Sequence, residues 1–264
     1  YGLWDDKIKL LHVGELKPAK YDLVIIGTPP DTHINLALEV LRDFPPKALL
    51  LEKPLCTPSL SGCQELLALA ESTGTFVAVG YNHTLTKSTR MASGLTKNGM
   101  IGHPLTISAR FREYWGGIFG AHPWLSGPKE SYLGFYDRGG GASGEHSHAI
   151  NIWQHFAHLL HMGRIVEVSA MLDLIDDGKV KYDRICQLNV KTEEGFIGSI
   201  VQDVITEPAQ KYLRIQGSSG FLEWYVNYDK DNDALIYGDC KSGVRKKLIS
   251  KKRPDDFIGE IDHI

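Results

Sequence analysis

A lysine stands directly after a short apolar run in the first quarter of the chain. Residues 48–51 (ALLL) are followed by Glu52, Lys53 and Pro54. In open α/β sheets, ligands bind beyond the carboxyl ends of the strands, and a lysine buried at such a place commonly has a lowered pKa. The pattern therefore predicts that Lys53 takes part in proton chemistry with a lowered pKa. A surface ion pair between Lys53 and Glu52 is the alternative, because structural ion pairs are common.

A second group of reactive side chains follows the glycines at 139–141. Glu145, His146 and His148 come first, and His155, His158 and His161 follow. Imidazoles and carboxylates transfer protons, and they also bind transition metals. A metal-dependent enzyme using the His146/His148 cluster is therefore a lesser hypothesis. Nothing upstream completes a ligand set, so we expect no metal site here.

A long aromatic segment lies between these two groups, from Tyr114 to Gly139. Long loops in compact domains are often functional. Aromatic faces with polar tips suit a polyhydroxylated substrate, because sugar C–H faces stack on rings while hydroxyls find hydrogen-bond partners. The candidate substrate contacts are Trp115, Trp124 and Tyr136. An oligomer contact is an equal alternative, and candidates for binding a carboxylate or phosphate are Arg110, Arg112 and Arg138.

The elements that position Lys53 alternate between strand and helix. Apolar runs predict strands at 23–26, 48–51 and 76–79. A helix capped by Asp31 or Thr32 and a second helix running from Pro58-Ser59 to Gly74 separate them. Strands alternating with helices of this length predict a parallel Rossmann-type sheet of βαβ units.

The pattern changes after Asn82. Helices are expected at 88–98 and 148–160, with strands at 105–111, 166–174, 183–191, 195–204, 211–216, 220–226 and 234–237. Short turns join several of these strands, which predicts an open, mainly antiparallel β-sheet. The expected fold is an α/β module followed by an α+β module. The expected domains are 1–82, for dinucleotide binding, and 83–264, for substrate binding and oligomerisation.

Composition excludes several functions. The chain has 264 residues, a formal charge of -3 and no basic stripe, which argues against nucleic-acid binding. The basic clusters at 245–247 and 251–253 are interpreted as solvated surface. No apolar run approaches the roughly 20 residues that span a bilayer. The cysteines (Cys56, Cys63, Cys186 and Cys240) show no CxxC spacing, so we expect free thiols in a reducing cytoplasm.

Several short motifs occur together in one order along the chain. They are DLVIIGTPPDTH at 22–33, EKP at 52–54, GYN at 80–82, GMIG at 99–102, GGGA at 139–142 with HAIN at 148–151, and IQGSSGFL at 215–222. In this order and spacing they resemble the glucose–fructose oxidoreductase/inositol dehydrogenase/MocA family of NAD(P)-dependent oxidoreductases. A single one of these motifs is weak evidence, whereas the set in register is specific.

The resemblance implies a hydride transfer between NAD or NADP and a hydroxyl or keto group of a sugar, cyclitol or sugar derivative. It implies that Lys53 hydrogen-bonds the reacting oxygen and that His148 is the general base. Glu145 and His146 would lie at the substrate. The implied cofactor contacts are Gly27, Thr28, Pro29, Pro30, His33, Glu52 and Asn82. It further implies a homo-oligomer formed through the C-terminal sheet.

The chain departs from the family pattern at two places. The family has an Asp four residues before the catalytic His, where this chain has Gly144 and, beside it, Glu145. Either Glu145 supplies the carboxylate, or the histidines transfer the proton without it. Residues 1–21 also lack the expected glycine-rich phosphate turn, so we expect the chain to be a fragment. These departures leave a non-catalytic Rossmann-like scaffold or ligand sensor as the alternative function.

Overall fold

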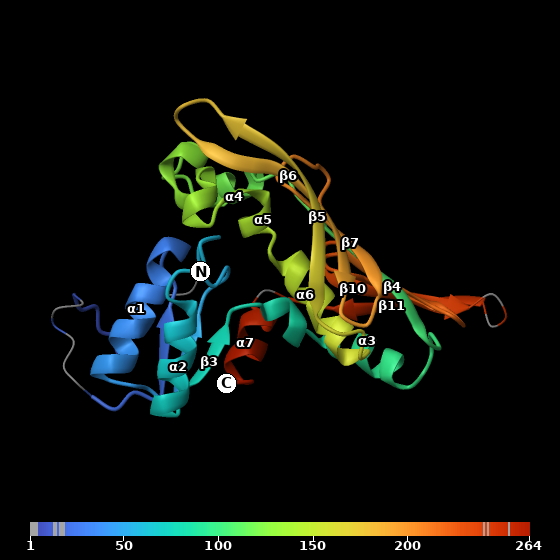
Figure 1. The fold of residues 1–264 in the computed structure, drawn as a ribbon, viewed down its shortest axis with the longest axis horizontal. Helices are drawn as coiled ribbons and strands as arrows, with labels where there is room; N and C mark the ends of the chain where they lie inside the picture. The colour runs from blue at the N-terminus through green and yellow to red at the C-terminus, as the bar shows by residue number, and fades with distance from the viewer. Residues whose placement is uncertain (1–4, 13–14, 16–18, 240, 242, 253) are drawn as a thin grey trace.

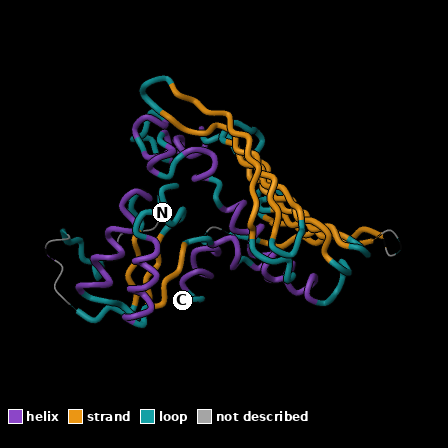
Figure 2. The backbone as a smooth tube through the Cα atoms, viewed as in Figure 1, coloured by secondary structure: helices purple, strands orange, loops and turns teal. Residues whose placement is uncertain are grey.

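The computed structural model describes residues 5–12, 15, 19–239, 241, 243–252 and 254–264. These residues form one sheet of three strands and one of eight (Figures 1 and 2). The expected fold class, a parallel Rossmann-type sheet followed by a mainly antiparallel one, is confirmed. Among the described residues, no helix combines the length and the apolar character needed to cross a membrane.

The smaller sheet contains β1 (Leu23–Ile26), β2 (Ala48–Leu51) and β3 (Phe76–Val79). The strands are parallel and lie in the order β1-β2-β3. Every residue of β2 is buried, which explains its unbroken apolar sequence. Two helices, α1 (Pro30–Asp43) and α2 (Cys63–Thr73), connect the strands and share one apolar cluster with them.

Both helices begin at places other than those predicted. The N-cap of α1 is Pro29, which makes no side-chain cap, and Pro30 is the first helical residue, where its missing N–H costs nothing. The α2 helix begins at Cys63 and not at Pro58-Ser59. Before it, Leu60 and Gly62 have φ values of 55° and 77°, so the chain turns there instead of entering a helix.

The larger sheet has the strand order β11-β10-β9-β8-β4-β7-β6-β5. Only the β4–β7 pair among its described neighbours is parallel. The strands are β4 (Pro104–Arg112), β5 (Ile165–Asp176), β6 (Lys181–Thr192), β7 (Ile197–Asp203), β8 (Gln210–Gly217), β9 (Phe221–Tyr225), β10 (Asn232–Asp239) and β11 (Gly243–Ser250). The last of these was missed, because its basic residues looked like free surface. As an edge strand it carries exposed charge, which discourages further pairing.

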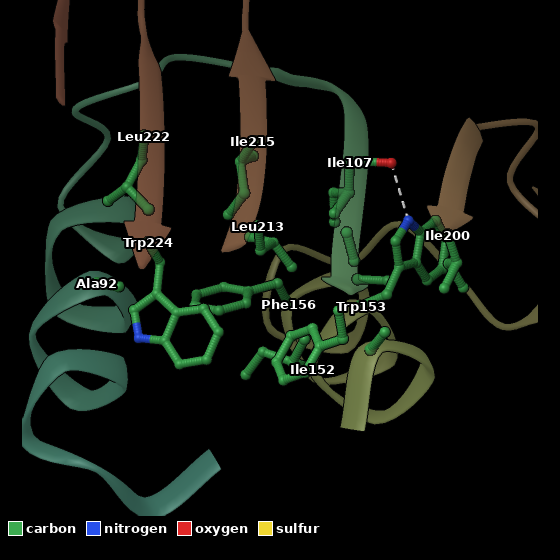
Figure 3. Packing of buried hydrophobic residues seen from close by; sticks show 14 of the residues in the cluster. Ala92, Ile107, Ile152, Trp153, Phe156, Ile200, Leu213, Ile215, Leu222 and Trp224 are labelled. Carbon is green, nitrogen blue, oxygen red and sulfur yellow. Dashed lines mark hydrogen bonds between the residues drawn. The ribbon is translucent and has the colours of Figure 1, made fainter. Parts of the chain in front are cut away.

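Two helices cover one face of the larger sheet, α3 (Lys87–Lys97) and α6 (His148–Leu159). Their apolar side chains interdigitate with those of the central strands (Figure 3). Trp153 of α6 is fully buried, and its Nε1 donates a hydrogen bond to the carbonyl of Ile107 at 2.9 Å. This buried bond fixes α6 on the sheet and therefore fixes His148 at its N-terminus.

The aromatic segment is built from short helical pieces. These are α4 (Gly116–Ala121), three 3₁₀ turns (Pro128–Glu130, Tyr132–Gly134 and Tyr136–Arg138) and α5 (Gly141–Glu145). They carry the chain to His148, under the β5–β6 hairpin (Figure 1).

The last described helix, α7 (Asp255–Ile261), returns toward the smaller sheet. It packs on the 3₁₀ turn η2 (Asn82–Leu85) and lies beside β3 in Figure 1. The turn η2, which follows β3, thereby contacts both α6 and α7.

Candidate active site

Glu52 lies across the carboxyl ends of the three parallel strands. A Cβ atom built on Gly80 would lie 3.1 Å from Glu52 Oε2, and one built on Gly27 would lie 3.9 Å from Glu52 Cγ. The absence of side chains at these two positions therefore leaves room for the carboxylate. Gly27, Thr28 and Pro29 are exposed at the end of β1, so their backbone is open to a ligand.

His33 joins the ends of two strands. Its ring is fully buried, with Nε2 2.6 Å from the carbonyl of Thr28 and Nδ1 3.1 Å from the carbonyl of Pro54. Pro30 is also buried. It packs against Gly139 so closely that a Cβ atom built on Gly139 would lie 2.8 Å from the Cβ of Pro30. His33 and Pro30 therefore support the turns at Thr28 and Pro54 from beneath, and they reach a cofactor only through those turns.

Lys53 forms a buried ion pair with Glu145. Its Nζ lies 3.0 Å from Glu145 Oε2 and 3.0 Å from the Glu145 carbonyl, and the side chains are 16% and 19% exposed. The peptide bond between Lys53 and Pro54 is cis. Glu145, one residue beyond Gly144, thus brings a carboxylate to Lys53.

The ion pair corrects the expected direction of the Lys53 pKa. Burial disfavours the ammonium, but Glu145, with smaller contributions from Tyr132 and Glu52, outweighs burial and raises the pKa of Lys53 above its ordinary value. Burial acts against the Glu145 carboxylate as well, and Lys53 reverses the effect, so the pKa of Glu145 is lowered. The pair therefore favours the charged form of Lys53, which suits it to donate hydrogen bonds.

The His148 ring contacts the ring of a second histidine, His83, that the sequence analysis missed. The ring centroids of His148 and His83 lie 4.5 Å apart at 57°. Burial, reinforced by the other ring and by Lys53, lowers the pKa of His148 well below its ordinary value, and burial also lowers that of His83. Both rings are therefore neutral near pH 7. The sequence did offer one indication of His83, because it directly follows Asn82, a predicted cofactor contact just beyond β3.

Three buried polar atoms near these rings have no hydrogen-bond partner within the described part of the chain. They are Nδ1 of His83, Nδ1 of His148 and Oδ1 of Asn82. An unpaired buried polar atom is costly, so it commonly marks a place where water or a ligand binds. The three residues line a cavity of ≈ 680 Å³, together with Lys211, Asn227, Asp229, Lys230, Lys251, Pro254, Asp256 and Phe257. Lys211 and Lys251 carried no signal in the sequence, because neither belongs to one of the motifs.

Tyr81 contacts the ring of His148 and interacts electrostatically with Lys53. Its ring centroid lies 5.6 Å from that of His148, at an angle of 82°. Burial raises the pKa of Tyr81, and the positive charge of Lys53 opposes this shift. Lys53 and His148 thus share one electrostatic environment. Lys53 is not among the residues that line the cavity, because its Nζ is turned toward Glu145.

The remaining predicted substrate contacts lie apart from one another. Trp115 is 7% exposed and packs with Tyr182 at 4.8 Å in a small apolar cluster, so it is a core residue. Trp124 is 73% exposed and contacts His122 at 5.1 Å. His146 is buried, and burial lowers its pKa to about 4, which favours the neutral ring.

Tyr136 and the three arginines also lie outside the cavity. The ring of Tyr136 contacts Lys181, whose Nζ is 5.8 Å from the ring centroid. Arg112 is paired with Asp203 and Arg138 with Asp31, while Arg110 lies over the ring of Tyr212. Among the described residues, no group of three or more His, Cys, Asp or Glu side chains is arranged to hold a metal ion.

Fold and site together define the class of two-domain oxidoreductases, in which a Rossmann-type half precedes an open antiparallel sheet. Residues 8–81 match the family described as "Oxidoreductase family, NAD-binding Rossmann fold". Residues 89–223 match the "GFO/IDH/MocA C-terminal domain", which is half of the chain. The chain belongs to this GFO/IDH/MocA family of oxidoreductases, and the expectation of an NAD-binding Rossmann domain is confirmed.

Curated relatives match over a short region. "Uncharacterized oxidoreductase YdgJ" of Escherichia coli is 33% identical over 93 residues, which are 35% of this chain and 26% of that protein. "Uncharacterized protein C12C2.04" of Schizosaccharomyces pombe is 28% identical over 90 residues, or 32% of this chain and 23% of that protein.

Solved structures match over nearly the whole chain. An inositol dehydrogenase homologue from Azotobacter vinelandii, complexed with NAD+, has a TM-score of 0.68 at 17% identity; the match covers 90% of this chain and 60% of that one. A putative oxidoreductase from Thermotoga maritima has a TM-score of 0.70 at 17% identity, covering 92% and 70%. At these identities the likeness shows a common fold. The chain thus spans about 60% of the length of the inositol dehydrogenase homologue.

Proposed function

We propose that the protein of which this chain is a part is an NAD(P)-dependent oxidoreductase acting on a hydroxyl or keto group of a polyhydroxylated substrate such as a sugar or cyclitol. The observation that carries the proposal is the buried Lys53–Glu145 pair, which lies at the ends of parallel strands in a domain of the NAD-binding type. A neutral His148 lies in the same electrostatic environment. We also propose that the two domains meet at residues 82 and 83.

The strand ends fit the nicotinamide half of a dinucleotide. Gly27, Thr28 and Pro29 are exposed there, and Glu52 lies between Gly27 and Gly80. The bound cofactor supplies the hydride acceptor or donor of the reaction. We assign Gly27, Thr28, Pro29 and Glu52 to contact with it, and Asn82 to its carboxamide or to a substrate hydroxyl. His33 and Pro30 hold the turns in place.

The charged lysine fits the task of stabilising an alkoxide. A carbinol carbon loses hydride more easily as its O–H bond loses the proton, and a fixed ammonium near that oxygen stabilises the developing negative charge. Both observed hydrogen bonds of the Lys53 ammonium go to Glu145, so the proposal gives the third N–H to the substrate oxygen, while Glu145 keeps Lys53 charged. His148 takes the proton on its neutral ring.

The cavity beside His148 suits a polyol. Asn82 Oδ1 requires a donor, and each buried Nδ1 of His83 and His148 requires a donor or an acceptor according to its tautomer. A hydroxyl group offers both functions, whereas an apolar ligand offers neither. One structural neighbour is described as complexed with NADH and myo-inositol, which supports the same substrate class.

The experiment is a polyol and sugar screen on the full-length protein, with reduced nicotinamide absorbance as the readout and cofactor fluorescence as a binding assay. The proposal expects saturable dinucleotide binding and turnover with at least one polyhydroxylated compound. Binding without turnover of any compound would favour the ligand sensor, and absence of both would favour the scaffold.

We further propose that the protein is a homo-oligomer assembled through the larger sheet. Its edge strand β5 exposes several apolar side chains, and contact with a second copy of the chain would remove them from water. They are Val166, Val168, Met171, Leu172 and Leu174. Light scattering tests this: the wild-type protein should have a multiple of its chain mass, and Met171→Glu should shift it toward the monomer. A wild-type monomer at micromolar concentration would contradict the proposal.

A further inference from the structure

Two cysteine thiols meet just beyond the lysine motif. The Sγ atoms of Cys56 and Cys63 lie 3.5 Å apart, and Cys63 donates a hydrogen bond to Cys56. Both residues are free and half-buried, so a small reagent can reach them. Cys56 follows Pro54 by two residues, and Cys63 is the first residue of α2.

The segment between the two cysteines is folded back on itself. The amide of Leu60 bonds to the carbonyl of Thr57 at 3.2 Å, and the amide of Cys63 bonds to the carbonyl of Leu60 at 3.2 Å. A disulfide has an S–S length of about 2.05 Å, so the sulfurs must approach by only about 1.5 Å. We propose that Cys56 and Cys63 form a reversible disulfide, a thiol-oxidation site next to Lys53 that neither the family nor the hydride-transfer chemistry requires.

The oxidant that fits this site is a small-molecule disulfide. The Cys63 thiol loses its proton to solvent, and its thiolate attacks the reagent, forming a mixed disulfide and releasing a thiolate that takes up a proton. The Cys56 thiol then loses its proton and attacks the Cys63 sulfur, which forms the Cys56–Cys63 bond and releases a second small thiol. Two protein thiols are oxidised, and one disulfide is reduced to two thiols.

The order of attack follows from the surroundings of Cys56. Burial raises the pKa of Cys56 to about 12. A thiol with a raised pKa is a poor first nucleophile at neutral pH. The first attack therefore falls to Cys63, and Cys56 resolves the mixed disulfide at short range.

The disulfide is expected to act on Lys53 through the two residues that separate Lys53 from Cys56. His33 bonds to the carbonyls of Pro54 and Leu55, at 3.1 and 3.3 Å. Drawing the sulfurs together pulls on this clamped segment, and the strain reaches the hydrogen bonds of Lys53 with Glu145. This second part of the inference rests on the proposed function.

Peptide mapping of the full-length protein after treatment with oxidised glutathione tests the site without any activity assay. The expected result is a peptide pair linked through Cys56 and Cys63 that disappears on reduction. Cys63→Ser should abolish the link and leave no adduct on Cys56, whereas Cys56→Ser should accumulate glutathione on Cys63. Cys186 is the internal control, because it is 2% exposed and should react only after unfolding. Full alkylation of both thiols in oxidised wild-type protein, or a persistent mixed disulfide on Cys63, would overturn the proposal.

Turnover tests the coupling to Lys53. Misplacing a reacting group by about 1 Å can cost up to about 100-fold in rate, so oxidation should lower turnover between about 10-fold and 100-fold, reversibly. Cys63→Ser should keep the reduced wild-type turnover and resist the oxidant. A linked protein with unchanged turnover would contradict the coupling. If no substrate is turned over at all, the proposed function fails, while the mapping still decides whether the disulfide forms.

Discussion

The Lys53 ammonium lies 3.0 Å from a carboxylate oxygen of Glu145, which is 92 residues further along the chain. This contact ties the smaller sheet to α5. It also places a carboxylate at the site although position 144 is a glycine. Most of the chemistry proposed for the site depends on this pair.

Glu145→Gln should make the lysine titrate in the assay range. Glu145 is the main group that raises the pKa of Lys53, and burial opposes it. Without the carboxylate, burial lowers the pKa, so the ammonium is lost as the pH rises. We expect activity that falls on the alkaline side, with a loss in kcat/KM of about 10–100-fold. A pH–rate profile measures this effect.

Glu65→Gln is the matched control for that variant, because Glu65 forms an exposed ion pair with Arg42. Its pH–rate profile should equal that of the wild type. Superimposable profiles for Glu145→Gln and the wild type would show that the ion pair does not set the charge of Lys53.

Glu260 should make the fold less stable as the pH rises. Burial, helped by the nearby Glu52, raises the pKa of this α7 carboxyl to about 7. When the folded-state pKa of a carboxyl lies above its unfolded value, the carboxyl does not lower the free energy of unfolding at pH values below the unfolded pKa. The loss of unfolding free energy begins as the pH rises above the unfolded pKa and is complete once the pH passes the folded pKa. Glu260→Gln should therefore stabilise the protein at pH 8 by roughly 1–3 kcal/mol and have little effect at pH 4.

Thermal or urea unfolding at several pH values checks the Glu260 prediction. Glu39→Gln, at an exposed position of α1, is the control and should show no such pH dependence. If the difference in unfolding free energy between Glu260→Gln and the wild type were the same at every pH, the raised pKa assigned to Glu260 would be contradicted.

His83→Gln should weaken substrate binding more than cofactor binding. The buried Nδ1 of His83 has no partner among the described residues, and it lines the same cavity as His148. Losing one such hydrogen bond costs about 0.5–1.5 kcal/mol, or roughly 2–12-fold in KM. The measurement is KM for the substrate and Kd for the dinucleotide, with the exposed His103→Gln as control. A change in dinucleotide Kd alone would place His83 at the cofactor.

Truncation of Trp115 should destabilise the fold far more than truncation of Trp124. Trp115 is buried against Tyr182, so Trp115→Ala should cost about 3–5 kcal/mol of unfolding free energy. Trp124 is largely exposed, and Trp124→Ala should stay within about 0.5 kcal/mol of wild type. Urea unfolding of both variants measures the difference, and equal losses would contradict the assigned burial.

The sequence predicted the strands well because their patterns are local. The apolar runs at β1, β2 and β3 have the bounds that the structure shows. Helix starts were less predictable, since positive φ at Leu60 and Gly62 delays α2 until Cys63. The β11 strand was missed because nearly all of its residues are exposed and several are basic, so no apolar pattern marks it.

The candidate site was only partly predictable for a related reason. Lys53 and His148 stand in short motifs, so sequence alone singled them out. The raised pKa of Lys53 depends on a contact with Glu145 that only the fold creates. Trp115 looked like a substrate contact because an aromatic side chain in a long loop has the same sequence signal whether it packs inward or faces solvent.

The most direct test of the account is turnover by Lys53→Met in the full-length protein. Methionine keeps the length and the apolar stem of the side chain and removes the ammonium, so kcat should fall by about 10²–10⁴-fold while the dinucleotide Kd stays close to wild type. Lys47→Met is the control, because Lys47 is an exposed lysine one strand length away, and it should keep full activity. Wild-type turnover by Lys53→Met would remove the lysine from the reaction and contradict the proposed mechanism.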